Sequence, residues 1–461
     1  MAPDADLGTC VLVWAVAALY LLVRHWRDGG GVGLLLTYIL SFGVMHWFPS
    51  TLHLLPWFTT RGTSLVAEGM RQSAIAIVSL AAGAELMAWL SRRRADPRPS
   101  PRWPDAAAGA SRALDAHSVV YVLVVGFMLY AVLSRLIGTI PGLQAIVATG
   151  SAVLVVGLAL EVWNARETGS RARLVLWLSA PLLLPLVTVI TQGFLGYGFA
   201  AMLTVYAFSA NFLRPRWKVL VAASLLAYVG LSVYITYMRD RSDIRRMVWG
   251  GSAFTDRASQ LLDTFAGMEW FDYRNQAHLD RVDSRLNQNF LVGAAVSRLD
   301  RGLVPFAAGA TLEDAALSLV PRVLWPNKPT VGGSGDLVST YTGIRFAEGT
   351  SVGVGQVLEC YINFGRTGIA IGFFLIGMVL VLADQSALRA LERGDVFGFT
   401  IRYLPALGVM QVGGSFAEVV STAGAGFLVA VLMRWFALRF LPVRPATLGA
   451  SAVLSPPAES P

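Results

Sequence analysis

Long apolar runs recur along almost the whole chain, and they limit its fold more than any other feature. Each run is about 18 to 22 residues long, enough to cross about 30 Å of hydrocarbon as one helix. With 55% hydrophobic and only 14% charged residues among 461, a soluble protein could not hide so much apolar surface. The sequence therefore predicts an all-α integral membrane protein. We expect about eleven spans, in a range of about 10 to 13, at 7–23, 31–48, 69–90, 117–134, 142–162, 174–192, 194–212, 219–238, 352–382, 396–415 and 417–434.

The run at 352–382 is longer than one span requires. It is interrupted by Asn363-Phe-Gly-Arg-Thr-Gly368, in which two glycines flank a charged residue. This pattern predicts a short entering helix followed by a full span.

Arginines in the short connections give an expected orientation. Every second short connection is basic, and the intervening short connections hold only Arg61, Arg71 and Arg135. The basic connections carry Arg24, Arg27, Arg92, Arg93, Arg94, Arg98, Arg102, Arg112, Arg166, Arg171, Arg173, Arg214, Arg216, Lys218, Arg389, Arg393, Arg434, Arg439 and Arg444. The positive-inside rule places the basic side in the cytoplasm, so we expect the N-terminus outside and the C-terminus inside.

One block of mostly polar residues, 239–351, divides the chain. We expect an N-terminal bundle of about eight spans at 1–238, this block as one large, mostly helical outer loop, C-terminal spans at 352–440 and a disordered cytoplasmic tail at 441–461. Within the loop, apolar spacing predicts short helices at 254–265, at 286–299 and, with a capped start at Thr311, up to Leu319. Such helices would lie over the membrane mouth.

Several functional classes find no support in the sequence. The net charge of +8 is topological in a membrane protein, and no basic face with interleaved aromatics indicates nucleic-acid binding. Cys10 and Cys360 form no disulfide framework or zinc motif, and the five histidines lack metal-ligand spacing. The turn Gly332–Gly335 lacks the Lys-Ser/Thr of a phosphate loop. We therefore expect neither a metal nor a cofactor.

A distinctive motif lies around the end of the polar block. It reads Pro321-Arg322-Val-Leu-Trp325-Pro326-Asn327-Lys328-Pro329, then Gly349-Thr350, Gly355 and Glu359, then Tyr361-Ile-Asn363-Phe364-Gly365-Arg-Thr-Gly368. This order of elements resembles the O-antigen polymerase (Wzy) family of oligosaccharide repeat unit polymerases. Elsewhere the similarity is one of layout, with many spans and one large loop late in the chain.

The resemblance implies a membrane glycosyltransferase of the bacterial inner membrane. Such an enzyme joins undecaprenyl-diphosphate-linked repeat units on the periplasmic face into O-antigen, capsule or exopolysaccharide, and the lipid diphosphate is the leaving group. Membrane lipids and a chain-length regulator are the other partners that the resemblance implies. An O-antigen ligase, which shares the layout, and a transporter or flippase of lipid-linked glycan remain open alternatives.

This reaction needs fixed cations for a diphosphate whose charge grows as the glycosidic bond breaks. Arginine suits the task because its planar fork meets phosphate oxygens bidentately. The candidates outside a span or near the motif are Arg239, Arg241, Arg245, Arg322, Lys328 and Arg345. In the alternative interpretation, Arg239 and its neighbours form ordinary ion pairs with Asp240 and Asp243, and the motif cations only fix a Pro-rich turn.

The reaction also needs a group that accepts the acceptor proton. Glu359 is the first candidate because an ionisable group at membrane depth is costly without a function or a partner. Asn363, one helical turn later, would support it. His278 is a second candidate, and Glu418 is another membrane-depth carboxylate that could line the same cavity, with Trp325 of the motif as a supporting residue. In the alternative interpretation, Glu359 pairs with a neighbouring arginine and His278 is solvated.

Overall fold

The computed structural model describes residues 3–27, 30–60, 62–94, 114–133, 149–211, 217–320, 325, 327, 334–346 and 352–440. Within these ranges the chain forms helices and no strand. Six helices are long and apolar enough to cross a membrane: Asp6–Arg27, Thr63–Arg93, Arg171–Gln192, Val221–Trp249, Gln356–Glu392 and Phe416–Phe440. Each overlaps one predicted span. The helical membrane architecture is confirmed, whereas the count of eleven spans remains a prediction.

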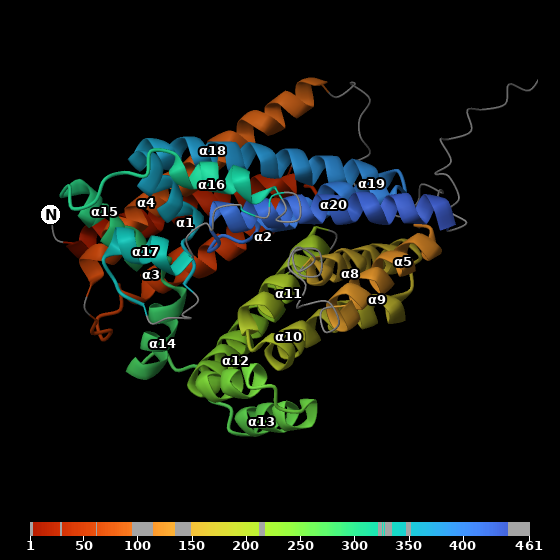
Figure 1. The fold of residues 1–461 in the computed structure, drawn as a ribbon, viewed down its shortest axis with the longest axis horizontal. Coiled ribbons are helices and arrows are strands. Elements are labelled where there is room, and N and C mark those ends of the chain that lie inside the picture. Colours follow the sequence, from red (N-terminus) through yellow and green to blue (C-terminus); the bar gives the residue numbers. More distant parts are fainter. Residues whose placement is uncertain are drawn as a thin grey trace, which may run out of the picture.

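The first group of helices holds most of the largest apolar core, and residues of the second group described below, among them Val119, Val156 and Phe208, also belong to that core. The first group comprises α1 (Pro3–Arg27), α2 (Leu34–Phe42), the π-helical turn η1 (Gly43–Trp47), α3 (Phe48–Leu52), α4 (Thr63–Arg94), α15 (Gln288–Asp300), α16 (Ala310–Ser318), α17 (Ser334–Thr342), α18 (Gln356–Glu392), α19 (Val396–Val409) and α20 (Phe416–Phe440). Figure 1 shows α18 alongside α4, and α20 alongside α19 and α16. Elements from both ends of the chain therefore build this core together.

The second group lies below the first in Figure 1. It comprises α5 (Ala116–Phe127), the π-helical turn η2 (Met128–Leu133), α8 (Gly150–Glu167), α9 (Arg171–Ser179), the 3-10 turn η3 (Ala180–Leu183), α10 (Leu184–Gln192), α11 (Leu195–Ala210), α12 (Trp217–Trp249), α13 (Phe254–Ala266) and α14 (Gln276–Leu286). A smaller apolar core of its own joins α10, α11, α12 and α13. The long α12 continues past the boundary that we expected at residue 238, so the first arginines of the predicted loop belong to its last turns.

Close backbone approaches bring α15 against α4. A Cβ atom on Gly69 of α4 would lie 1.9 Å from the carbonyl oxygen of Asn289 on α15, so only glycine fits there. The apolar face of α15 is buried, including Val292, Ala295 and Val296. This helix, one of those that we expected over the membrane mouth, packs along the first turns of the candidate span α4, because its apolar face needs a partner.

The helix α18 is broken, as the sequence predicts. Phe364 (φ −141°) and Gly365 (φ 60°, ψ −146°) leave the helical region. A Cβ atom on Gly372 would lie 2.6 Å from the Sγ atom of Cys360, although twelve residues of straight helix span about 18 Å. The short first half, from Gln356, therefore folds back on the long second half as a helical hairpin.

The loop helices expected at 254–265, 286–299 and after residue 310 are present as α13, α15 and α16, and the pattern did not predict α14 or α17. One detail is wrong: α16 has Gly309 as its N-cap, and Thr311 lies inside the helix. The hydroxyl of Thr311 instead accepts a hydrogen bond from Asn363. The prolines of the motif and the expected tail lie outside the described residues.

Candidate functional site

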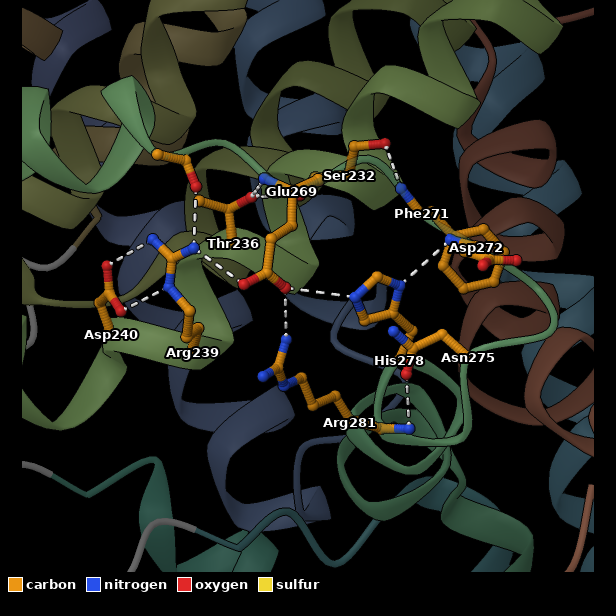
Figure 2. A network of polar contacts seen from close by, with 12 residues as sticks. Ser232, Thr236, Arg239, Asp240, Glu269, Phe271, Asp272, Asn275, His278 and Arg281 are labelled. Atoms are coloured by element: carbon orange, nitrogen blue, oxygen red, sulfur yellow. Dashed lines mark hydrogen bonds and ion pairs between the residues drawn. The ribbon is translucent and has the colours of Figure 1, made fainter.

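Two of the predicted site residues meet around a carboxylate that the sequence did not single out. Glu269 lies in the stretch that joins α13 to α14, and its Oε1 accepts a hydrogen bond from Nη1 of Arg239 at 2.9 Å. Its Oε2 accepts from Nη1 of Arg281 at 3.0 Å and lies 3.2 Å from Nε2 of His278. Figure 2 shows these side chains converging from α12 and α14 on Glu269. We call these residues, together with Asp240, the Glu269 cluster.

A polar stripe on α12 holds this stretch of chain in place. Tyr228, Ser232 and Thr236 recur every four residues and share one face of the helix. The backbone N–H of Glu269 donates to Thr236 Oγ1, and that of Phe271 donates to Ser232 Oγ, both at 3.0 Å. The Tyr228 hydroxyl donates to the carbonyl of Phe271 at 3.3 Å. Hydroxyl groups of α12 thus form the hydrogen bonds that the backbone of Glu269 and Phe271, which lie outside any helix, would otherwise lack. These bonds fix the position of Glu269.

The surrounding donors keep Glu269 ionised. The hydrogen bond from Arg239, with smaller contributions from Arg281 and His278, lowers the pKa of Glu269 to about 2, against partial burial that raises it. Arg239 also donates to both carboxylate oxygens of Asp240, at 2.8 and 2.9 Å. Two carboxylates therefore neutralise Arg239, which leaves it less suited to hold a diphosphate than its neighbours.

His278 is buried, and both of its ring nitrogens are occupied. The backbone N–H of Asp272 donates to Nδ1 at 3.1 Å, so the ring proton sits on Nε2 and points at Glu269. This arrangement gives His278 the role of a positioning residue for Glu269. A proton-accepting role would require the Asp272 hydrogen bond to break first.

Three other arginines form a group of like charge, which we call the arginine trio: Arg241 and Arg245 of α12 and Arg285 of α14. The charge on Arg241 is repelled by those of Arg245 and Arg285, and Arg241 is hydrogen-bonded to Tyr237. The Arg245 guanidinium lies over the ring of Phe194, 4.2 Å from its centre. In the part of the chain that the structure describes, no carboxylate lies within 4.0 Å of a trio nitrogen. The trio is thus an unneutralised basic surface.

The predicted base Glu359 lies in a second centre, the hairpin of α18. It is only 1% exposed, and its Oε2 accepts the backbone N–H of Phe416 at 2.6 Å. The Asn363 amide donates to the Glu359 carbonyl and to Thr311 Oγ1, both at 2.7 Å. Asn363 Oδ1 in turn accepts from the N–H of Gly309 at 2.9 Å. Glu359 and Asn363 therefore tie the starts of α16 and α20 to the hairpin, and no arginine among the described residues pairs with Glu359.

Glu418 lies on the first turn of α20 and is exposed. It forms a capping box, since its Oε2 accepts the N–H of Ser415 at 3.0 Å and its own N–H donates to Ser415 Oγ at 3.2 Å. Ser334 Oγ donates to its Oε1 at 2.9 Å. The hydroxyl of Tyr197 interacts electrostatically with both Glu418 and Arg245. Tyr197 therefore lies within electrostatic range of both Glu418 and Arg245 of the trio, whereas Glu359 is buried.

The other predicted site residues are less informative. Arg345 is exposed beyond the end of α17, and Trp325 is 39% exposed. Arg322 and Lys328 lie outside the described residues. Among the residues that are described, no group of three or more His, Cys, Asp or Glu side chains is placed to hold a metal ion.

Sequence reasoning missed Glu269, Arg281 and Arg285. One signal was available, because Arg281 and Arg285 are spaced four residues apart and share a face of one helix. Glu269 carries no such signal, since its role depends on partners about 10 and 30 residues away in an irregular stretch.

Comparison with known proteins identifies a family without a known activity. A family model described as a domain of unknown function, DUF8712, matches residues 110–440. No curated protein and no solved structure matches the chain. The match runs from just before α5 to the end of α20, and it includes the Glu269 cluster, the arginine trio and the α18 hairpin. The matched region is well over half of the sequence, so the chain belongs to the DUF8712 family.

Proposed function

We propose that the protein polymerises undecaprenyl-diphosphate-linked oligosaccharide repeat units on the periplasmic face of the bacterial inner membrane. The resemblance of its Pro-rich and Asn-Phe-Gly motifs to the O-antigen polymerase family suggests the reaction. The observation that carries the proposal is the arginine trio, because it offers the chemistry that a lipid diphosphate requires.

The trio is unfavourable without an anion. The positive charges of Arg245 and Arg285 repel that of Arg241, and this repulsion is unfavourable unless an anion offsets it. Arg241, Arg245 and Arg285 have no carboxylate partner within 4.0 Å among the described residues, whereas Arg239 and Arg246 on the same helix do. A diphosphate would relieve this repulsion and accept several charge-assisted hydrogen bonds. The trio therefore supports binding of a phosphorylated substrate better than a purely structural role.

The proposed reaction is a glycosyl transfer between two lipid-linked glycans. A hydroxyl oxygen of the acceptor attacks the anomeric carbon of the donor glycan, and the bond from that carbon to the diphosphate oxygen breaks. The diphosphate leaves with the bonding electron pair, and the trio stabilises its growing charge. The acceptor proton passes to a carboxylate.

Glu418 suits the proton-accepting role better than Glu359 does. Its residue is exposed, and Tyr197 lies within electrostatic range of both Glu418 and Arg245, whereas Glu359 is 1% exposed and bonded to the N–H of Phe416. We therefore propose Glu418 as the base and Glu359, with Asn363, as positioning residues that hold the first turn of α20.

Deleting the gene and separating the surface polysaccharide on a gel tests the function. A polymerase predicts loss of the ladder of long chains, while material with a single repeat unit remains. Loss of all surface glycan would instead favour a flippase. Long free glycan that is no longer attached to its final acceptor would favour a ligase.

A further inference from the structure

Two exposed aromatic rings lie at the tip of the α18 hairpin. Phe364, at the break of the hairpin, is 51% exposed, and Phe306, in the loop before α16, is 45% exposed. The ring centre of Phe306 lies 6.3 Å from that of the buried Tyr361. We call Phe306 and Phe364 the aromatic platform.

The backbone holds the platform in an unusual conformation. Ala308 has a positive φ of 49° and adjoins Gly309 at φ 101°, while Gly365 has φ 60°. The N–H of Ala307 donates to the carbonyl of Ile362 at 2.8 Å, which locks the loop to the hairpin. A non-glycine residue with positive φ costs free energy, and such residues cluster where a ligand is gripped. The two exposed rings are therefore carried on backbone that is locally strained at Ala308.

Charged groups border the platform. The hydroxyl of Tyr361, which packs near Phe306, donates to Oδ1 of Asp300 at 2.8 Å. Arg366, two residues after Phe364, has a 57% exposed side chain and lies 3.8 Å from Glu68. Ionisable groups are costly in hydrocarbon, so lipid tails would be poor neighbours for this surface. The platform combines flat apolar surface with donors and acceptors at its edge.

We propose that the aromatic platform binds a sugar ring of the acceptor glycan. A pyranose has one face of C–H groups, which can stack on an aromatic ring, and a rim of hydroxyl groups. Asp300 can accept hydrogen bonds from these hydroxyls and Arg366 can donate to them, as in sites with apolar walls and a few placed polar groups. None of these residues belongs to the trio, so the platform would hold the glycan while the trio holds the lipid diphosphate. The identity of the ligand rests on the proposed function.

The test uses the deletion strain complemented with variants of the full chain, with the cell's own glycan as the probe. Phe306→Ala/Phe364→Ala removes both rings, and Phe306→Tyr/Phe364→Tyr keeps them. Leu303→Ala is the matched control, because Leu303 is an exposed apolar residue in the same loop and has no ring. The amount of each variant in the membrane is measured by immunoblot.

We expect the double alanine variant to bind the acceptor roughly tenfold more weakly, from the loss of two aromatic contacts. The gel should then shift from long chains to chains of a few repeats, whereas the tyrosine variant and Leu303→Ala keep the wild-type ladder. A wild-type ladder from the double alanine variant would overturn the glycan site, and so would equal shortening by Leu303→Ala. If wild-type complementation restores no ladder, the proposed function itself fails.

Discussion

Oε2 of Glu359 accepts the backbone N–H of Phe416 at 2.6 Å across 57 residues of sequence. A buried carboxylate of the α18 hairpin thus binds the first turn of α20, where the helix dipole favours negative charge. The exposed Glu418 lies on that same turn. Glu359 thus holds this turn from the buried side, while Glu418 lies on its exposed side and accepts hydrogen bonds from Ser415 and Ser334.

The two glutamates should respond differently to the loss of charge. Glu359→Gln keeps an oxygen that can accept from Phe416, so we expect polymerisation within about tenfold of wild type. Glu418→Gln removes the proposed base and should lower the rate by about 100-fold or more. Polymer formation by purified protein from lipid-linked repeats measures both. The reverse order of effects would return the base role to Glu359.

Glu359→Ala should act on stability. The substitution leaves the Phe416 N–H without its partner, and we expect the free energy of unfolding to fall by about 1 to 3 kcal/mol. Thermal unfolding of the protein in detergent measures this loss. A melting curve equal to that of wild type would show that the hydrogen bond does not hold α20.

Stability should depend on pH through Glu269. Its pKa is lowered from 4.5 to about 2 in the folded protein, so its contribution is fully present above about pH 4.5 and is lost as the pH falls towards 2. Glu269→Gln removes that contribution. The melting temperatures of wild type and variant should therefore differ near pH 6 and converge as the pH is lowered from about 5 towards 2. A difference in melting temperature that widens as the pH is lowered would contradict the proposed stabilisation of ionised Glu269 by its partners.

Two glycines in apolar helices should tolerate alanine differently. In α4, a Cβ atom on Gly69 would lie 1.9 Å from a backbone oxygen of α15, so Gly69→Ala must push the two helices apart. We expect this change to lower the free energy of unfolding by about 1 to 3 kcal/mol. In α1, Gly8 has nothing within 4 Å of such an atom, and Gly8→Ala should be neutral or stabilise the helix by up to about 1 kcal/mol. Thermal unfolding in detergent compares the two. Equal effects would mean that α15 does not pack against α4.

Local periodicity made much of the fold predictable. The helices at 254–266, 288–300 and 310–318 and the break at Phe364 and Gly365 follow from apolar spacing and from glycine. The location of α15 does not follow from local spacing. Its Asn289 bonds with His46 and Ser73, more than 200 residues away, and a helical pattern cannot encode such partners.

The candidate site was predictable only in part. A run of arginines at the end of a span marked the part of α12 that carries Arg239 and the trio residues, but it could not separate Arg239, which Asp240 and Glu269 neutralise, from Arg241 and Arg245. That distinction depends on the fold of an irregular stretch held by side chains of α12. The sequence placed Glu359 and Asn363 one helical turn apart, as the structure has them, yet the bond of Glu359 to Phe416 required the hairpin.

The most direct test of the central claim is polymerisation by purified protein from undecaprenyl-diphosphate-linked repeats. Arg241→Ala/Arg245→Ala is compared with Arg246→Ala, an exposed arginine of the same helix that pairs with Asp243. We expect the double variant to lose at least about 100-fold in rate, because each lost donor weakens stabilisation of the leaving diphosphate, while Arg246→Ala stays near wild type. Wild-type rates from a folded double variant would contradict the role of the arginine trio.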